Sequence, residues 1–157
     1  MRRSIEEILG EARIEDIDFR KVPHVAPATP MAEVYRLLDA ERIGAVVVCE
    51  GERVVGMFTE RDLLYRTALE KVDPGTPVGE LMTPEPRTLH PGQRVAEAIA
   101  AMAQGGFRQM PVVDDGGRVV GLVTSRAVLR FIADHYPAAV LNLPPRLHQR
   151  PSHPEGG

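Results

Sequence analysis

The spacing of apolar positions predicts a series of short strands and helices in the first half of the chain. Met31, Val34 and Leu38 recur at helical spacing, which predicts a helix that starts at a Thr29 cap, carries Pro30 in its first turn and ends at 41–42. Around it we expect an extended segment over 21–27, strands over 45–49 and 53–58 joined by a tight turn at 50–52, and a helix over 62–68.

The second half repeats this order of elements after a Pro- and Gly-rich linker at 73–77. We expect a helical turn over 78–82, a strand over 87–89, a helix over 95–103, strands over 110–113 and 118–123, and a helix over 125–135. At the N-terminus, Ser4 and Glu7 have capping-box spacing, which predicts a helix over 4–12, whereas 13–22 fits no single element. The stretch that follows 136 is rich in Pro, Arg and His, which predicts a largely disordered tail.

The two halves also match in sequence. GERVVGMFTERDLL at 51–64 and GGRVVGLVTSRAVL at 116–129 lie 65 positions apart and agree at eight of fourteen positions. Further out, the run 46–48 aligns with 111–113 and, with one residue of slip, 32–33 aligns with 96–97. Two similar halves predict a pseudo-symmetric pair. Each half reads β-α-β-β-α, so we expect an α/β fold whose sheets pack together, because about sixty residues alone bury too little surface.

Composition and charge narrow the class of protein. The net charge is −3 and the chain has no basic cluster of the kind that nucleic acid requires, so no nucleic acid partner is expected. No apolar stretch reaches the length of a membrane span, and early glutamates interrupt any signal core, which predicts a soluble cytoplasmic protein without membrane association. The single cysteine, Cys49, excludes an internal disulfide framework and fits a reducing compartment.

No motif has the spacing of a catalytic or metal-binding site. The chain has no phosphate-binding loop of the G-x-x-x-x-G-K-[ST] type, no G-x-G-x-x-G, no H-E-x-x-H and no paired cysteines. Its five histidines are scattered, and no serine has a His and Asp partner that spacing reveals. We therefore expect a protein that is not an enzyme, with no catalytic residues and no metal.

The junction between the strand at 53–58 and the following helix is the candidate ligand site. A helix N-terminus offers free backbone N–H groups and a partial positive charge, which suit a phosphate. Thr59 adds a hydroxyl donor, Arg61 can pair with phosphate oxygens, and the Asp62 carboxylate can accept two hydrogen bonds from a ribose cis-diol. Thr59 and Asp62 also have the spacing of a capping box with Asp in place of Glu, which starts a helix without any ligand. The two interpretations are compatible, and both stay open.

Several phrases of the sequence resemble the CBS repeat, named after cystathionine beta-synthase. GMFTERD at 56–62 is similar to the family's Gly-apolar-apolar-Thr/Ser-x-x-Asp motif, VGELMTP at 78–84 to its V-x-(D/E)-(I/L)-M-T phrase, and FRQMPVVD at 107–114 to its R-H-L-P-V-V-D strand. The resemblance covers roughly 13–135. It implies two CBS repeats, at 13–72 and 73–135, which form a Bateman module with an N-terminal helix at 1–12 and a tail at 136–157.

The resemblance also implies a function and a set of binding residues. The cleft between the sheets would bind an adenosyl ligand such as AMP, ADP, ATP or S-adenosylmethionine, and the module would sense energy or metabolites as a homodimer or through a regulated protein partner. Asp62 would hold the ribose, Thr59 would lie near phosphate and Arg108 would be a basic phosphate contact. The remaining residues of the expected site are Ile43, Gly44 and Ala45 around the base, with Arg61, Met57, Met110 and Pro111 beside them.

The second half departs from the family pattern at one position. Thr124 and Arg126 are present, but Ala127 stands where the motif has its aspartate. A methyl group cannot accept the ribose hydrogen bonds, and losing bonds to a charged acceptor costs about 1.5–3 kcal/mol. We expect one functional site, at Asp62, and a second that is vacant, weak or altered in selectivity. The alternative is a structural interaction module that binds no ligand.

Overall fold

The computed structural model describes residues 4–19, 21–42 and 44–135 of the chain. Its first half contains α1 (Ile5–Glu11), a 3-10 turn η1 (Ile14–Asp16), β1 (His24–Val25), α2 (Met31–Glu41), β2 (Ala45–Glu50), β3 (Arg53–Thr59) and α3 (Glu60–Leu69). The second half contains a 3-10 turn η2 (Val78–Glu80), β4 (Thr83–Pro84), α4 (Val95–Gly105), β5 (Gln109–Val113), β6 (Val119–Thr124) and α5 (Ser125–His135). The α/β class predicted from the sequence is confirmed.

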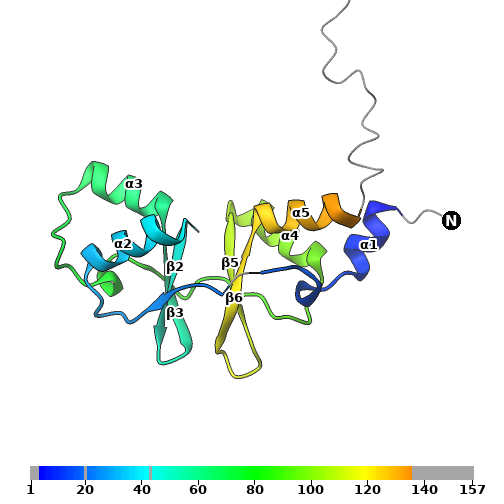
Figure 1. The fold of residues 1–157 in the computed structure, drawn as a ribbon, viewed down its shortest axis with the longest axis horizontal. Coiled ribbons are helices and arrows are strands. Elements are labelled where there is room, and N and C mark those ends of the chain that lie inside the picture. The colour runs from blue at the N-terminus through cyan, green and yellow to red at the C-terminus, as the bar shows by residue number, and fades with distance from the viewer. Residues whose placement is uncertain (1–3, 20, 43, 136–157) are drawn as a thin grey trace, which may run out of the picture.

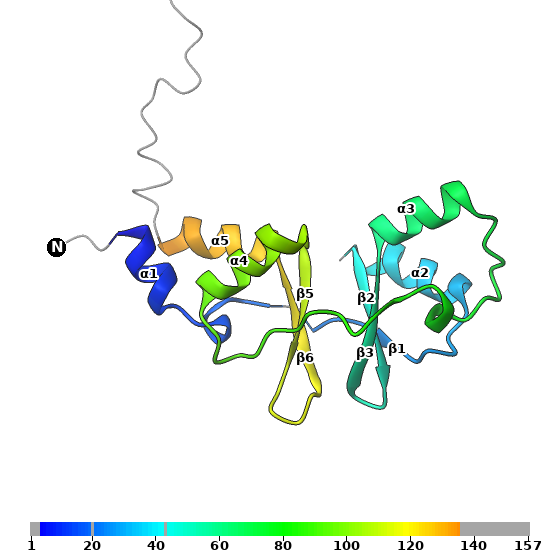
Figure 2. The same cartoon turned by 180° about the vertical axis from the view of Figure 1, so that it is seen from behind.

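Two β-hairpins stand side by side at the centre of the molecule, with helices on their outer sides (Figures 1 and 2). The first belongs to a four-stranded sheet of order β1-β2-β3-β4, in which β1 runs parallel to β2 and the other neighbours are antiparallel. The second hairpin pairs β5 with β6, and Leu89 adds a parallel bridge to Val112. Side chains of α2 and α3 cover the first hairpin, and those of α1, α4 and α5 cover the second.

Both faces of β2 are buried, so its side chains divide between two cores. Val46 and Val48 point into the core of the first half with α2, whereas Val47 and Cys49 point into a cluster between the two hairpins. That central cluster also contains Met57 of β3 and Leu122 of β6. At the tips of the hairpins, the Val119 N–H donates to the Glu52 carbonyl at 2.9 Å. The two halves are therefore joined by apolar packing along the strands and by backbone pairing at the turns.

Each half also receives the 3-10 turn that precedes the other half. Ile14 of η1 is fully buried in the core that β5, β6 and α4 form, and Val78 of η2 is fully buried in the core of the first half. The hydrogen bonds of the two turns match at an offset of 64 residues: Ile14 N–H to the Gln93 carbonyl (2.9 Å) corresponds to Val78 N–H to the Thr29 carbonyl (2.8 Å). The sequence pattern left the structure of 13–22 open. In the structure this segment carries the turn that packs into the core of the second half.

The strand registers correct one part of the sequence alignment. Val48 pairs with Gly56 and Val112 pairs with Gly121, so the strands before the turns correspond at an offset of 64, not 65. The alignment of Val46–Val48 with 111–113 is wrong by one residue. The reason is the turn, because the pair Cys49 and Val54 corresponds to the pair Val113 and Val119, and five residues lie between the second pair where four lie between the first.

The ends of several elements differ from the prediction. Ser4 caps α1 as expected, with its Oγ accepting from the Glu7 N–H at 3.1 Å. Thr29 does not cap α2; the N-cap is Pro30, which makes no side-chain cap bond. The strand expected at 87–89 is reduced to the single bridge at Leu89, and β4, which pairs with β3, was not predicted. The tail expected at 136–157 lies outside the described residues.

Candidate functional site

The junction of β3 and α3 is a capped helix start. Asp62 Oδ2 accepts from the Thr59 N–H at 2.9 Å and from the Thr59 hydroxyl at 3.1 Å, while the Asp62 N–H donates to Thr59 Oγ1 at 3.2 Å. The capping interpretation is therefore present in the structure. Among the described contacts, the second carboxylate oxygen, Oδ1, accepts no hydrogen bond. Because Asp62 is only half-buried, this oxygen leaves an acceptor for a ligand hydroxyl.

The backbone before β2 forms the other wall of this junction. Ala45 pairs with Thr59 in the ladder, and the Glu60 N–H donates to the Gly44 carbonyl at 2.9 Å. Gly44 has a φ of +80°, which favours glycine, and a Cβ built there would lie 3.0 Å from Gln109 Nε2. The side-chain amide of Gln109 in the second half therefore reaches the first junction, so both halves contribute to it.

The structure distributes the other predicted residues over several places. Met57 lies in the cluster between the hairpins, Met110 is 1% exposed in the core of the second half, and Pro111 is buried in β5. Arg61 is exposed, with its guanidinium carbon 5.6 Å from the centre of the Tyr65 ring. Ile43 lies outside the described residues. Gly44, Ala45, Thr59 and Asp62 are thus the predicted residues that meet at one junction.

A cleft lies at the corresponding junction of β6 and α5 in the second half. Thr124 Oγ1 accepts from the Ala127 N–H at 3.0 Å, so half of the capping box remains although the acidic residue is missing. The volume of the cleft is about 550 Å³. It is lined by Asp16, Asp18, Arg42, Arg108, Gln109, Leu122, Thr124, Ser125, Arg126, Ala127, Arg130, Phe131, Asp134 and His135. Arg108 therefore lines this Ala127 cleft.

Sequence reasoning missed the residues that reach the Ala127 cleft from distant segments. Asp16 and Asp18 come from the exchanged N-terminal stretch, and Arg42 follows α2 in the first half. No local motif marks these positions. A signal was available at Arg42, because this residue precedes the apolar run of β2 at the place where the second half has Gly106, a typical helix end.

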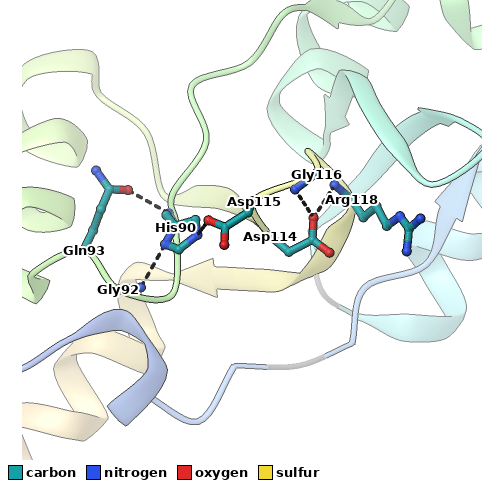
Figure 3. Close-up of polar contacts among 7 residues, drawn as sticks. All are labelled: His90, Gly92, Gln93, Asp114, Asp115, Gly116 and Arg118. Carbon is teal, nitrogen blue, oxygen red and sulfur yellow. Dashed lines mark hydrogen bonds and ion pairs between the residues drawn. The ribbon is translucent and has the colours of Figure 1, made fainter.

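A third polar cluster holds the loop before α4 against the turn between β5 and β6 (Figure 3). His90 Nδ1 accepts from the Gly92 N–H at 3.1 Å, so His90 Nε2 carries the ring proton and donates to Asp115 Oδ1 at 2.6 Å. The His90 N–H donates to Gln93 Oε1 at 2.7 Å. Because the carbonyls of Pro91 and Gln93 accept the η1 bonds, this cluster fixes the loop that receives the exchanged turn.

In the part of the chain that the structure describes, little supports metal binding, a membrane-spanning helix or a reactive thiol. Within those residues, no three His, Cys, Asp or Glu side chains group closely enough to hold a metal ion. None of the described helices is both long and apolar enough to cross a bilayer. Cys49 is a free thiol in the central cluster, where burial raises its pKa to about 11 and keeps it protonated at neutral pH.

Comparison with known proteins identifies the family. The family model of the CBS domain matches residues 14–68 and 78–134, so the chain belongs to the CBS domain family and carries two copies in tandem. The CBS domain-containing protein YhcV of Bacillus subtilis is 33% identical over 110 residues, which are 70% of this chain and 78% of YhcV.

Two solved structures have the same fold and are crystal structures of complexes with adenosine derivatives. CBSX2 in complex with AMP aligns with a TM-score of 0.70 at 25% identity, over 78% of this chain and 97% of CBSX2. The CBS domain pair of protein MJ0100 in complex with 5'-methylthioadenosine and S-adenosyl-L-methionine aligns with a TM-score of 0.69 at 26% identity, over 79% of this chain and 98% of the pair.

Proposed function

We propose that this chain is a regulatory module that binds an adenosyl compound at the Asp62 junction. The observation that carries the proposal is the half-buried Asp62 carboxylate, which caps α3 with Oδ2 and keeps Oδ1 for a ribose hydroxyl. Gly44 and Ala45 provide close-approaching backbone beside it, and the start of α3 provides positive dipole for a phosphate. The site chemistry therefore suits a ribonucleotide.

The proteins of similar fold support an adenosyl ligand. CBSX2 is bound to AMP, and the MJ0100 pair is bound to methylthioadenosine and S-adenosylmethionine. We propose AMP, ADP, ATP or S-adenosylmethionine as candidates for this chain. The role proposed is binding and regulation in the cytoplasm, without catalysis, nucleic acid or membrane.

The proposed output is packing of this chain on a second copy or on a regulated protein. Leu64 and Leu69 of α3 are 68% and 80% exposed, and Leu129 of α5 is 65% exposed. Both helices lie on the same side of the molecule, opposite the hairpin turns (Figure 1). Exposed aliphatic side chains on two helices of the same side suit a homodimer interface. Analytical ultracentrifugation tests the homodimer. A wild-type dimer and a monomeric Leu64→Glu/Leu129→Glu variant support it, and a wild-type monomer contradicts it.

The ligand proposal is tested by thermal unfolding with each candidate. A ligand that binds only the folded state raises Tm by mass action, so AMP, ADP, ATP or S-adenosylmethionine should raise it saturably in the wild type. Asp62→Ala should lower the affinity for AMP or S-adenosylmethionine about tenfold or more, because it removes a charged acceptor. Glu7→Ala is the matched control, since it breaks the capping box of α1 away from the junction. It should keep the full ligand response.

Two results contradict the ligand proposal. If Asp62→Ala responds to AMP and S-adenosylmethionine as the wild type does, the carboxylate has no ligand role and only caps α3. If no adenosyl compound shifts the wild type, the alternative of a ligand-free interaction module is favoured. Ala127 supports that alternative, because one of the two junctions has already lost its acidic residue.

A further inference from the structure

Four arginine side chains without an ion-pair partner among the described residues line the Ala127 cleft. Arg42, Arg108, Arg126 and Arg130 line it from the end of α2, the start of β5 and the first turns of α5. All four are exposed, and within the described part of the chain none of them makes an ion pair or a hydrogen bond through its guanidinium group. Three carboxylates, of Asp16, Asp18 and Asp134, also line the cleft without pairing with them.

The pseudo-symmetry of the chain shows that this basic character belongs to one cleft only. Arg42 and Gly106 are equivalent because both end a helix in the left-handed conformation, and Arg108 and Gly44 are equivalent because the carbonyl of each accepts from the first residue of a helix. At the 65-residue offset of the helices, Arg130 corresponds to Tyr65. Three of the four arginines therefore have no counterpart in the first half.

Two acidic residues of the first junction are replaced by uncharged residues in the Ala127 cleft, which also makes this cleft more basic. Glu60 and Asp62 at the start of α3 correspond to Ser125 and Ala127 at the start of α5. Relative to the first junction, the Ala127 cleft gains three arginines and loses two acids. Asp18 and Asp134 offset two of these five charges, because their counterparts Met82 and Leu69 are uncharged. Two other differences cancel, because the counterparts of Phe131 and neutral His135 are Arg66 and Glu70. The cleft remains more basic than its counterpart by three formal charges.

Arg42, which lines this cleft, has an unfavourable backbone conformation. Its φ is +50°, and the left-handed region costs a residue with a Cβ about 1–2 kcal/mol. The second half places Gly106, with a φ of +67°, at the same helix end without that cost. A non-glycine residue in this conformation that also lines a cleft is consistent with a functional role for the arginine at this helix end.

We infer that the Ala127 cleft binds a ligand with two or more adjacent phosphates, held by these arginines, and does not require a free ribose cis-diol. Guanidinium groups bind phosphate oxygens through paired charge-assisted hydrogen bonds, and the N-terminus of α5 adds the partial positive charge of its helix dipole. The absence of a carboxylate at position 127 removes both the diol acceptor and a repulsive charge. The inference deepens the proposed function, on which it rests, by giving the two clefts different ligands.

The direct test is calorimetric titration of the full chain with inorganic tripolyphosphate at low, constant ionic strength. The wild type and Asp62→Ala should bind it equally, because Asp62 lies at the other junction. Arg108→Ala/Arg130→Ala should bind it about tenfold more weakly or worse, since two charge-assisted contacts are lost even after solvent screening. Arg36→Ala/Arg87→Ala is the matched control, because it removes the same charge from exposed residues outside the cleft. It should change the affinity less than about threefold.

Two further measurements separate phosphate recognition from sugar recognition. In the Asp62→Ala background, 2'-deoxy-ATP should displace tripolyphosphate as well as ATP does, whereas adenosine should not displace it. Ala127→Asp should weaken tripolyphosphate binding, because it restores a negative charge in the cleft. Circular dichroism checks that each variant is folded.

The outcomes distinguish this inference from the proposed function. Tripolyphosphate binding without any response to AMP or S-adenosylmethionine supports the inference and contradicts the adenosyl proposal. An adenosyl response lost in Asp62→Ala, with no tripolyphosphate binding by the wild type, does the reverse. Equal losses in the two double-arginine variants also overturn the inference, because they show a general charge effect instead of a site.

Discussion

The reciprocal exchange of the 3-10 turns predicts that a substitution near the N-terminus destabilises the distant second half. Ile14 is fully buried there, against β5, α4 and α5. Ile14→Ala removes three buried carbons at about 0.8 kcal/mol each, and the cavity that remains adds to this, so we expect a loss of about 3 kcal/mol. Val78→Ala removes two buried carbons from the first core, so we expect a loss of about 2 kcal/mol there.

Urea unfolding measures the size of each loss, and amide hydrogen exchange measures its location. Ile14→Ala should lower protection first in β5 and β6, and Val78→Ala should lower it first in β2 and β3. Replacing exposed Ile5 of α1 by alanine is the control for a nearby substitution outside the core, and it should cost less than about 1 kcal/mol. The reasoning is refuted if Ile14→Ala costs no more than this control, or if protection falls first in the hairpin of its own half.

Three further predictions follow from single positions. Gly56→Ala should cost about 1–3 kcal/mol in urea unfolding, because the new Cβ would overlap the Met82 side chain and must displace it; unchanged stability would mean that Met82 moves freely. Arg42→Gly should stabilise the protein by up to about 1 kcal/mol by relieving the left-handed strain, yet weaken tripolyphosphate binding; a loss of stability contradicts the strain. Burial raises the pKa of Cys49 to about 11 from 9.0, so its contribution to stability is complete below pH 9 and is lost as the pH rises toward 11. Chemical denaturation between pH 8 and 11 should show this fall in the wild type and a smaller one in Cys49→Ala.

The sequence predicts well the elements whose determinants are local. The Ser4 capping box starts α1, and the wholly apolar run in β2 forms a strand buried on both faces. It predicts poorly what depends on distant partners. The pairing of β4 with β3 and the burial of Ile14 under the second half follow from tertiary contacts, and no spacing within 13–22 reports them. The hairpin loops differ by one residue, and an ungapped alignment cannot place that difference.

The candidate site also has features with local determinants, which the sequence predicts, and features that depend on distant contacts, which it does not. The Thr59 and Asp62 spacing predicts the helix cap, and the structure has it with both bonds of the box. The lining of the Ala127 cleft could not be predicted, because Asp16, Arg42 and Arg130 come together only after the two halves have docked. Once the correspondence of the halves is known, however, the replacement of Gly106 by Arg42 and of Gly44 by Arg108 can be seen in the sequence itself.

The interlocked turns also bear on how the chain can be divided. A single cut in the 73–77 linker leaves η1 in the N-terminal fragment and η2 in the C-terminal fragment, although each is buried in the core of the other piece. We therefore expect a nicked molecule to stay together as a complex, and either fragment alone to expose the apolar surface that the missing turn covers. The smallest unit of this architecture that can complete its cores is the pair of repeats. A single repeat would need a redesigned first turn in order to fold alone.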